Sequence, residues 1–466
     1  MSVFTKNFQK NLGPSQYGHF SALLTGYFCK KLSKQLDNTQ KVGYNTIESY
    51  YSRKEDCFMT YIKRTIEEKI LSVSREYACL LLIGPRQVGK TTMLAHLMAD
   101  TPRTYVTLDD VDERKLAQTD PALFLSVHPV PVLIDEVQYA PELFSYIKIA
   151  VDRGATPGSY WLTGSQSFHL MELAQESLAG RTAILHMSAL SQSELYGDGS
   201  SEPFRLDLAA LQDCSQHLAS ASPAELFARI WEGAMPAHRS GKYTDRDLFY
   251  SSYVQTYIDR DVSDMIPGVD KLAYSDFIRA AACRVGQQLN LHDIAQDVGV
   301  SDDTAKRWMQ VLEKSEAVFF LRPYSNNLLK RTVKTPKLYF FDTGLVAYLT
   351  RYTSADILMN GAINGAILEN YAVSEIIKTY HNSARECVLH YYRDKDAREI
   401  DVVLESDGEL HPIEIKKTVS PGTELTRAFK LLDKGAVPRG VGAVLCLRDT
   451  LTAIDRNTYI VPIWMV

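Results

Sequence analysis

The sequence has no excess of positive charge. Its 466 residues include 51 Lys and Arg against 56 Asp and Glu, which gives a net charge of −5. A protein that covers nucleic acid over a wide surface needs a basic balance to neutralise the phosphates. The composition argues against such a surface, so any contact with DNA or RNA must be local.

Paired cysteines and long apolar runs are also missing. The seven cysteines are scattered, with no CxxC and no zinc-like Cys/His spacing, which fits a reducing compartment and predicts a cytoplasmic protein. The runs "CLLLIG" and "AVFFL" are too short to cross a bilayer and are typical of buried strands, so we expect no membrane partner. The apolar run at 20–28 is followed by Lys30 and Lys31 without a cleavage site, and secretion is not expected.

The length predicts about three domains. Helical spacing begins after Met59, in "MTYIKRTIEEKILSV", so we expect the working protein to begin near that residue. The residues before it are either the product of a mis-assigned start or a mobile, partner-binding arm. The predicted boundaries are an extension at 1–58, a P-loop domain at 59–200, a helical connector at 201–280, a winged-helix-like unit at 281–335 and a C-terminal domain at 336–466.

The P-loop domain is predicted to be an α/β sheet. Between 78 and 190, five short apolar runs alternate with helical stretches: "ACLLLI", "TYVTL", "VPVLID", "SYWLTG" and "AILHM". Apolar strands that alternate with helices indicate a sheet covered on both faces. The aromatic-rich segment from 201 to 280 follows as a helical connector or lid.

The motif "GPRQVGKT" at 84–91 matches GxxxxGK[ST] and directly follows the apolar run "CLLLI". Glycines let the loop point its N–H groups at phosphates, and the next helix adds its positive end. Lys90 is predicted to reach the β- and γ-phosphates of ATP, and Thr91 to bind Mg²⁺. The predicted nucleotide-binding residues are Gly84, Pro85, Arg86, Gln87, Val88, Gly89, Lys90, Thr91 and Thr92.

The run "VPVLIDE" at 130–136 ends in two carboxylates. Asp135 is predicted to hold Mg²⁺ through water, and Glu136 to polarise the attacking water, which separates a hydrolase from a nucleotide binder. Without the P-loop, the pair would be only a solvated strand end.

Two further residues are predicted to act in catalysis. In "WLTGSQS", Thr163 or Ser165 is expected near the γ-phosphate or water, and Ser165 is preferred, although a tight turn alone explains these residue types equally well. Arg181, in "LAGRTAILHM", is expected either to reach a neighbouring subunit's γ-phosphate in a homo-oligomer or to form a surface ion pair.

In their order, these motifs resemble the AAA-type P-loop ATPases that carry a C-terminal domain of unknown function 4143. The resemblance rests on "YIKRTIEEKI", "LLIGPRQVGKTT", "YVTLDD", "LIDEVQ", "LTGSQS", "LAGRT", "LSQSEL", "FFDTGLVAYL" and "GAILENYAVSEI". It covers the chain from Met59 to the end and implies an AAA-like sheet with its ATP site at the P-loop. It implies no settled biological role.

A helix-turn-helix is predicted at 289–315, with a turn at Gly299 and Ser301 as the N-cap of the second helix. The runs "AVFFLRPY" and "PKLYFF" are predicted to form a wing against it. Asp302 and Asp303 stand where a DNA reader would place phosphate-binding residues. A protein-docking winged helix is therefore as well supported as a DNA reader.

The C-terminal segments "LHYYRDKDAREIDVVLES" and "ELHPIEIKKT" are predicted to be antiparallel strands. Alternation places Glu414 and Lys416 on one face, with Asp401 beside them and Glu369 contributed by a preceding helix. Two carboxylates that share a divalent metal, beside a lysine that positions or activates water, are the chemistry of PD-(D/E)xK nucleases. The pattern resembles that superfamily, which implies a restriction-endonuclease-like α/β fold for about 360–466. Alternating charge on a solvated strand is the other interpretation.

Three functional hypotheses follow from these motifs. The first is an ATPase that couples ATP to a nuclease-like module acting on DNA or RNA. The second is an ATP-dependent switch or scaffold that binds a protein partner and has an inactive nuclease-like fold. The third is a DNA-binding regulator that uses ATP to control assembly.

Overall fold

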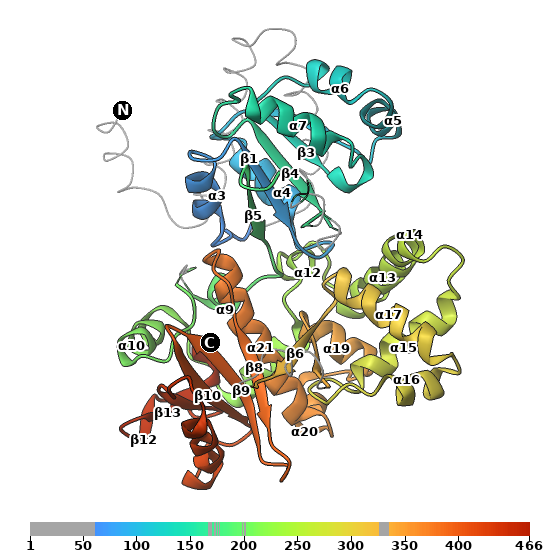
Figure 1. Ribbon diagram of the computed structural model, residues 1–466. Helices are drawn as coiled ribbons and strands as arrows, with labels where there is room; N and C mark the ends of the chain where they lie inside the picture. The colour runs from blue at the N-terminus through green and yellow to red at the C-terminus, as the bar shows by residue number, and fades with distance from the viewer. Residues whose placement is uncertain are drawn as a thin grey trace, which may run out of the picture. The chain divides into compact units, whose positions relative to one another are not determined.

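The computed structural model describes residues 61–165, 170, 171, 174, 176, 178–197, 199, 202–325 and 335–466 (Figure 1). The predicted extension at 1–58 lies outside these ranges. Residues Met59–Val466 belong to one compact unit. No helix in the described ranges is both long enough and apolar enough to cross a membrane.

The first sheet has five strands in the order β2-β3-β4-β1-β5, and every neighbouring pair is parallel. It confirms the five predicted strands. β4 lies between β1 and β3, so its end lies between the P-loop and the carboxylate pair that follows β3. The strands are β1 (Cys79–Ile83), β2 (Thr104–Thr107), β3 (Val132–Asp135), β4 (Tyr160–Gly164) and β5 (Thr182–His186).

Helices bury the apolar side chains of this sheet. Every residue of β1, β3 and β4 is buried, as expected for parallel strands covered on both faces. One core cluster joins Leu81 and Ile134 of the sheet to Phe124 and Phe144 of the helices. The helical elements of this region are α3 (Glu67–Val73), α4 (Lys90–Leu97), α5 (Val111–Thr119), α6 (Pro121–Val127), η1 (Val137–Tyr139) and α7 (Leu143–Asp152).

A mainly helical region follows β5, as predicted (Figure 1). Its α13 runs without a break into a π-helical turn, η2, and then into α14. The helices are α9 (Gln192–Tyr196), α10 (Leu208–His217), α11 (Pro223–Glu232), α12 (Pro236–Arg239), α13 (Arg246–Tyr257), η2 (Ile258–Val262), α14 (Ser263–Met265), α15 (Lys271–Ala282), α16 (Leu291–Val298), α17 (Asp302–Lys314), α19 (Thr343–Leu349) and α20 (Ala355–Asn360).

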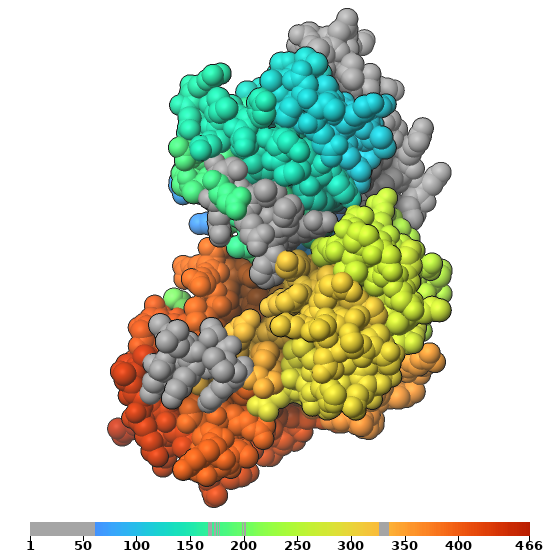
Figure 2. Space-filling model, turned by 45° about the vertical axis from the view of Figure 1, so that its right-hand side comes forward, coloured from blue at the N-terminus to red at the C-terminus, as the bar shows by residue number. Residues whose placement is uncertain are grey.

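Helices α16 and α17 form the two predicted consecutive helices. Gly299 ends α16 in the left-handed conformation, with φ 76°. The Ser301 hydroxyl caps α17 by accepting a hydrogen bond from the Thr304 N–H at 3.2 Å. The core face of α17 includes Trp308 and Leu312, both buried. Figure 2 shows the surface that α13 to α17 present, in yellow-green and yellow.

The second sheet has eight strands in the order β12-β13-β11-β10-β9-β8-β6-β7. β6 and β7 pair antiparallel, as predicted for the wing, but β6 also pairs with β8. The sheet therefore continues across the predicted boundary between 335 and 336. Its strands are β6 (Val318–Pro323), β7 (Lys337–Phe340), β8 (Leu389–Arg393), β9 (Glu399–Ser406), β10 (Glu409–Lys416), β11 (Gly442–Cys446), β12 (Thr452–Asp455) and β13 (Thr458–Pro462).

The C-terminal part of this sheet is mixed. β9 pairs antiparallel with β8 and β10, as predicted, whereas β10 pairs parallel with β11. The helix α21 (Asn364–Asn382) precedes these strands, η3 (Thr423–Lys434) lies between β10 and β11, and η4 (Ile463–Met465) ends the chain. The chain thus combines a parallel α/β sheet, a helical region and a mixed C-terminal sheet.

Candidate active site

The loop between β1 and α4 contains the two glycines that the motif requires. Gly84 has φ 149°, and a Cβ at this position would lie 2.1 Å from the carbonyl oxygen of Met187. Gly89 has φ 92° and is the N-cap of α4. The loop therefore ends at the positive end of a helix, as an anion site requires.

Lys90 is enclosed by the loop. Its side chain is buried, and Nζ donates hydrogen bonds to the carbonyl oxygens of Gly84 at 2.7 Å and Pro85 at 2.8 Å. Burial lowers the pKa of Lys90, and the carboxylate of Glu136 counteracts this effect most strongly. Of its neighbours in the motif, Val88 is buried, whereas Gln87 and Thr92 are exposed.

Thr91 and Asp135 lie side by side. The Thr91 hydroxyl lies 3.1 Å and 3.0 Å from the two carboxylate oxygens of Asp135. The Thr163 hydroxyl, from β4, donates to Asp135 as well. Burial raises the pKa of Asp135, and the hydrogen bonds from Thr163 and Thr91 counteract this in part. These hard oxygen donors are of the kind that Mg²⁺ binds, so the residues present fit that ion.

Glu136 follows Asp135 in the left-handed conformation, with φ 56°. The turn directs its carboxylate toward Gln138, whose Nε2 donates to Oε2. The Ser165 hydroxyl donates to the same oxygen at 3.4 Å. Of the two hydroxyl residues considered from the sequence, Thr163 contacts the carboxylate of Asp135, and Ser165 contacts that of Glu136.

Arg181 lies at the opposite end of the strands from the P-loop, because β1 and β5 are parallel, Arg181 precedes β5 and the P-loop follows β1. Its guanidinium forms an ion pair with Asp152, at the end of α7, and both side chains are partly exposed. Arg181 therefore does not reach the phosphate site of its own chain. The role toward a neighbouring subunit stays a prediction.

Two residues that the sequence analysis did not assign support the loop. Arg64 is buried and donates to the Val88 carbonyl at 2.9 Å and the Ser188 carbonyl at 2.8 Å. Asp261, in η2, forms an ion pair with Arg86 at 2.8 Å. No sequence motif indicated either contact, because Asp261 lies 175 residues from Arg86 and Arg64 precedes the motif.

The predicted carboxylate residues of the second sheet also meet. Lys416 Nζ lies 2.8 Å from Asp401 Oδ2 and 2.8 Å from Glu414 Oε1. Burial and the nearby charge of Asp401 raise the pKa of Glu414 to about 7. The other oxygen of Glu414, Oε2, is buried without a hydrogen-bond partner.

Glu369, predicted as a further acidic ligand, is bound by other residues. Its carboxylate accepts from Lys337 at 2.9 Å and from the Tyr339 hydroxyl. Lys337 also pairs with Glu399 at 2.6 Å. In the part of the chain that the structure describes, no group of three or more His, Cys, Asp or Glu side chains is arranged to hold a metal ion. Asp401 and Glu414 meet at Lys416, and burial and then the charge of Asp401 raise the pKa of Glu369. The role of Glu369 as a metal ligand stays a prediction.

Sequence models of three families match consecutive parts of the chain. Residues 76–196 match an AAA domain, residues 224–356 a domain of unknown function, DUF8612, and residues 364–466 another, DUF4143. The AAA match contains the whole P-loop and the Asp135–Glu136 pair. These matches support a P-loop ATPase. They confirm the predicted combination of an AAA-type domain with a C-terminal DUF4143 domain.

Similar whole proteins add no assigned activity. An uncharacterized protein of Mycobacterium tuberculosis is 28% identical over 355 residues, which are 76% of this chain and 74% of the relative. A Mycobacterium bovis protein, also uncharacterized, matches with the same identity and coverage. The Walker-type ATPase PABY2304 of Pyrococcus abyssi aligns at 14% identity and TM-score 0.42 over 62% of this chain and 96% of that chain. The RuvB Holliday junction branch migration motor of Thermotoga maritima aligns at 18% identity and TM-score 0.28 over 55% and 89%.

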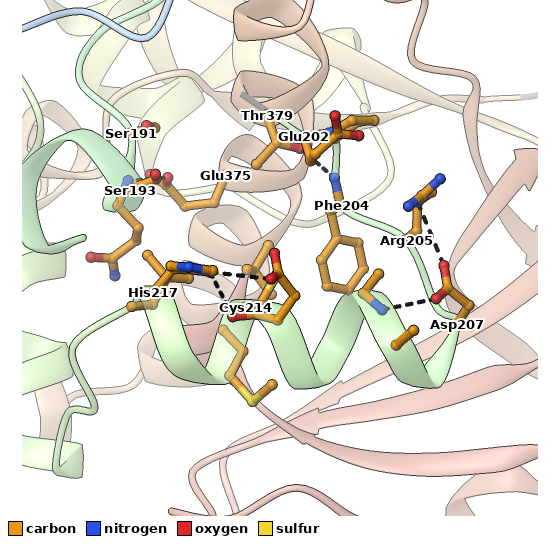
Figure 3. Close-up of a pocket in the computed structure, with 18 residues that line it drawn as sticks. Ser191, Ser193, Glu202, Phe204, Arg205, Asp207, Cys214, His217, Glu375 and Thr379 are labelled. Carbon is orange, nitrogen blue, oxygen red and sulfur yellow. Dashed lines mark hydrogen bonds and ion pairs between the residues drawn. The ribbon is translucent and has the colours of Figure 1, made fainter. Parts of the chain in front are cut away.

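A cavity of about 340 Å³ lies outside the ATPase site (Figure 3). α9, α10, α21 and the C-terminus line it. Its charged groups are paired within the chain, as between Arg205 and Asp207 at 3.5 Å and between His217 and Asp213 at 3.4 Å. The cavity contains none of the residues predicted for the phosphate or carboxylate sites, all of which are described.

Proposed function

We propose that this chain binds ATP with Mg²⁺ and hydrolyses ATP at the P-loop. The observation that carries the proposal is the contact of Thr91 with both carboxylate oxygens of Asp135, directly beside Glu136 and the enclosed Lys90. A loop that only binds anions requires no such carboxylate pair, whereas a hydrolase requires both a metal ligand and a base.

Each residue of the site has a separate task in this proposal. The loop N–H groups and the end of α4 bind the phosphates, and Lys90 places its charge on the β- and γ-phosphates. Thr91 and Asp135 would hold Mg²⁺, which neutralises phosphate charge when bound. Glu136 accepts the proton of the attacking water, while Gln138 and Ser165 hold its carboxylate in place.

The proposal includes a homo-oligomer, in which Arg181 stabilises the γ-phosphate charge of a neighbouring subunit. The position of Arg181 supports a role between subunits, because the residue lies at the amino end of the strands, away from the phosphate site of its own chain. In an oligomer of this kind, the partly exposed guanidinium is free to exchange Asp152 for a phosphate.

A second function is proposed for the C-terminal sheet: cleavage of DNA or RNA, coupled to ATP. The carboxylates of Asp401 and Glu414 both lie 2.8 Å from Lys416, and the pKa of Glu414 is raised. These contacts support a site at which either carboxylate would bind a divalent metal and Lys416 would position water. The alternative is an ATP-dependent switch in which this sheet binds a protein partner and Lys416 only neutralises two carboxylates.

Equilibrium binding of ATP in Mg²⁺ tests the main proposal. The wild-type chain is expected to bind, and Lys90→Ala to lose most of its affinity, with Lys115→Ala on the exposed surface of α5 as the matched control. Equal affinity of the wild type and Lys90→Ala would refute the site.

Incubation with DNA and with RNA in Mg²⁺ or Mn²⁺ tests the second function. Cleavage that Asp401→Ala abolishes, with ATP binding retained, supports the nuclease. If neither nucleic acid is cut, the switch is favoured instead.

A further inference from the structure

The ion pair between Arg86 and Asp261 joins the P-loop to the helical region. Arg86 Nε lies 3.0 Å from Oδ1 and 2.8 Å from Oδ2 of Asp261, and the two side chains are 15% and 7% exposed. An ion pair this far from solvent is not screened as surface pairs are. A change in this ion pair therefore affects both the P-loop and η2.

Arg86 belongs to the phosphate-binding loop. Burial lowers the pKa of its guanidinium, and the neighbouring carboxylates of Asp261 and Glu136 raise it by more. A guanidinium binds phosphate oxygens as well as it binds a carboxylate. The triphosphate of ATP brings several negative charges to this loop, whereas Asp261 brings one.

Asp261 depends on Arg86 for its charge. Burial raises the pKa of Asp261, Arg86 lowers it, and the nearby carboxylates of Glu136 and Asp264 raise it further. A buried carboxylate that loses its cation is strongly destabilised in general. The conformation of the segment that contains Asp261 is therefore expected to change when Arg86 moves away from its carboxylate.

That segment has an irregular backbone. Asp261 lies in the π-helical turn η2, between α13 and α14, which Figure 1 labels. π-turns inside helices are often found at functional sites. The regular α-helical hydrogen bonding is thus interrupted at the residue that binds Arg86.

We propose that Asp261 competes with the phosphates of ATP for Arg86, so that nucleotide occupancy is transmitted from the P-loop to the segment Arg246–Met265. The proposal rests on the proposed ATP binding. It gives the region matched by DUF8612 a role in reading the nucleotide state. Asp261 is a positioning residue here, because it acts through Arg86.

The competition predicts an unusual direction for a variant. Asp261→Asn keeps the shape of the side chain but cannot hold the guanidinium by charge, so Arg86 is free for the phosphates before ATP arrives. By linkage, removing a competitor raises affinity, and typical coupling energies correspond to about 5-fold to 150-fold. A purely structural ion pair predicts the opposite, since its loss would disturb the loop and weaken binding.

The test measures the affinity for the nonhydrolysable analogue adenylyl-imidodiphosphate in Mg²⁺. Asp261→Asn is expected to bind at least about 5-fold more tightly than the wild type. Asp264→Asn, which removes a carboxylate three residues further along, is the matched control and is expected to bind as the wild type does. Equal or weaker binding by Asp261→Asn overturns the proposal.

Hydrogen exchange of the wild-type chain provides a readout that does not depend on a variant. Amides of Ile258–Val262 are expected to exchange faster when the analogue is bound, and unchanged exchange there overturns the proposal. Failure of the two proposals can be distinguished. If the wild type does not bind the analogue, ATP binding itself is refuted; if it binds and only these responses are missing, the transmission through Asp261 is refuted.

Discussion

At the scale of single residues, Glu136 is the base that we propose for ATP hydrolysis. Its left-handed backbone and its contacts with Gln138 and Ser165 place one carboxylate next to the phosphate loop. Glu136→Gln keeps the shape but removes the base. Turnover of ATP is expected to fall by about 10²- to 10⁴-fold while ATP binding is retained.

Steady-state phosphate release, measured together with equilibrium binding, checks this prediction. Glu142→Gln, on the exposed surface at the start of α7, is the control and should leave turnover unchanged. Unchanged turnover in Glu136→Gln would mean that another group activates the water.

Gly84 is expected to tolerate no side chain. A Cβ there would lie 2.1 Å from the Met187 carbonyl oxygen, and φ is 149°. Gly154 has φ 95°, and no atom lies within 4 Å of an added Cβ, so a side chain there would cause backbone strain without a clash. Gly84→Ala should therefore lower the unfolding temperature more than Gly154→Ala, whose strain costs about 1 kcal/mol. Equal shifts in thermal unfolding would contradict this steric account.

His381 is expected to make the fold sensitive to acid. Burial, and then the nearby charge of His186, lower its pKa to about 4. The unfolded state binds a proton near pH 6.5, so stability is full above that pH and declines as pH falls from about 6.5 to 4. The loss attributable to His381 is at most about 3–4 kcal/mol.

Denaturant unfolding at pH 7 and pH 4.5 measures this loss. His381→Gln cannot take up the proton, so its stability should change less between the two pH values than that of the wild type. His96→Gln, on an exposed helix surface, should behave as the wild type. An equal acid loss in His381→Gln would assign the sensitivity to other groups.

At the scale of elements, the sequence predicts the features that are determined by residues close together in the chain. Thr91 and Asp135 could be assigned because Thr91 comes after β1 and its loop, and Asp135 ends β3. Parallel strands have their carboxyl ends on the same side of the sheet. The pairing of β6 with β8 and the contact of Arg86 with η2 could not be predicted. The residues that meet there lie far apart in the chain, and no periodic pattern marks them. The predicted division at 335 and 336 failed to anticipate the continuous sheet for the same reason.

Lys337 provides a test of that continuity. It is buried on β7 and pairs with Glu369 of α21 and Glu399 of β9. Lys337→Met leaves the buried Glu369 without its cation, whereas Glu399 keeps its ion pair with Arg393 at 3.3 Å. Loss of one partner of a buried pair typically costs about 3–5 kcal/mol. Thermal unfolding should occur at a clearly lower temperature than in the wild type.

Lys395→Met is the control for this prediction, because Lys395 is exposed in the turn between β8 and β9. If both variants unfold as the wild type does, the Lys337 pairs contribute little to stability, and the backbone pairing of β7 with β6 is the main link between β7 and the sheet.

At the scale of the whole molecule, Arg181 is predicted to act between subunits. Asp152→Ala breaks its ion pair within the chain, and Arg181→Ala removes the guanidinium. If Arg181 serves a neighbouring active site, only Arg181→Ala should lower turnover, by about 10³-fold or more for a residue of this kind. ATP-dependent assembly, followed by mass measurement in solution, must accompany the effect. A strictly monomeric chain under ATP would remove this role.

The central claim is that this chain hydrolyses ATP at the loop of Lys90 and Thr91. The most direct measurement is phosphate release from ATP in Mg²⁺ by the wild type and by Lys90→Ala, side by side. We predict steady turnover by the wild type and none above background by Lys90→Ala. Equal release by the two proteins, or no release by the wild type in the presence or absence of nucleic acid, would contradict the account.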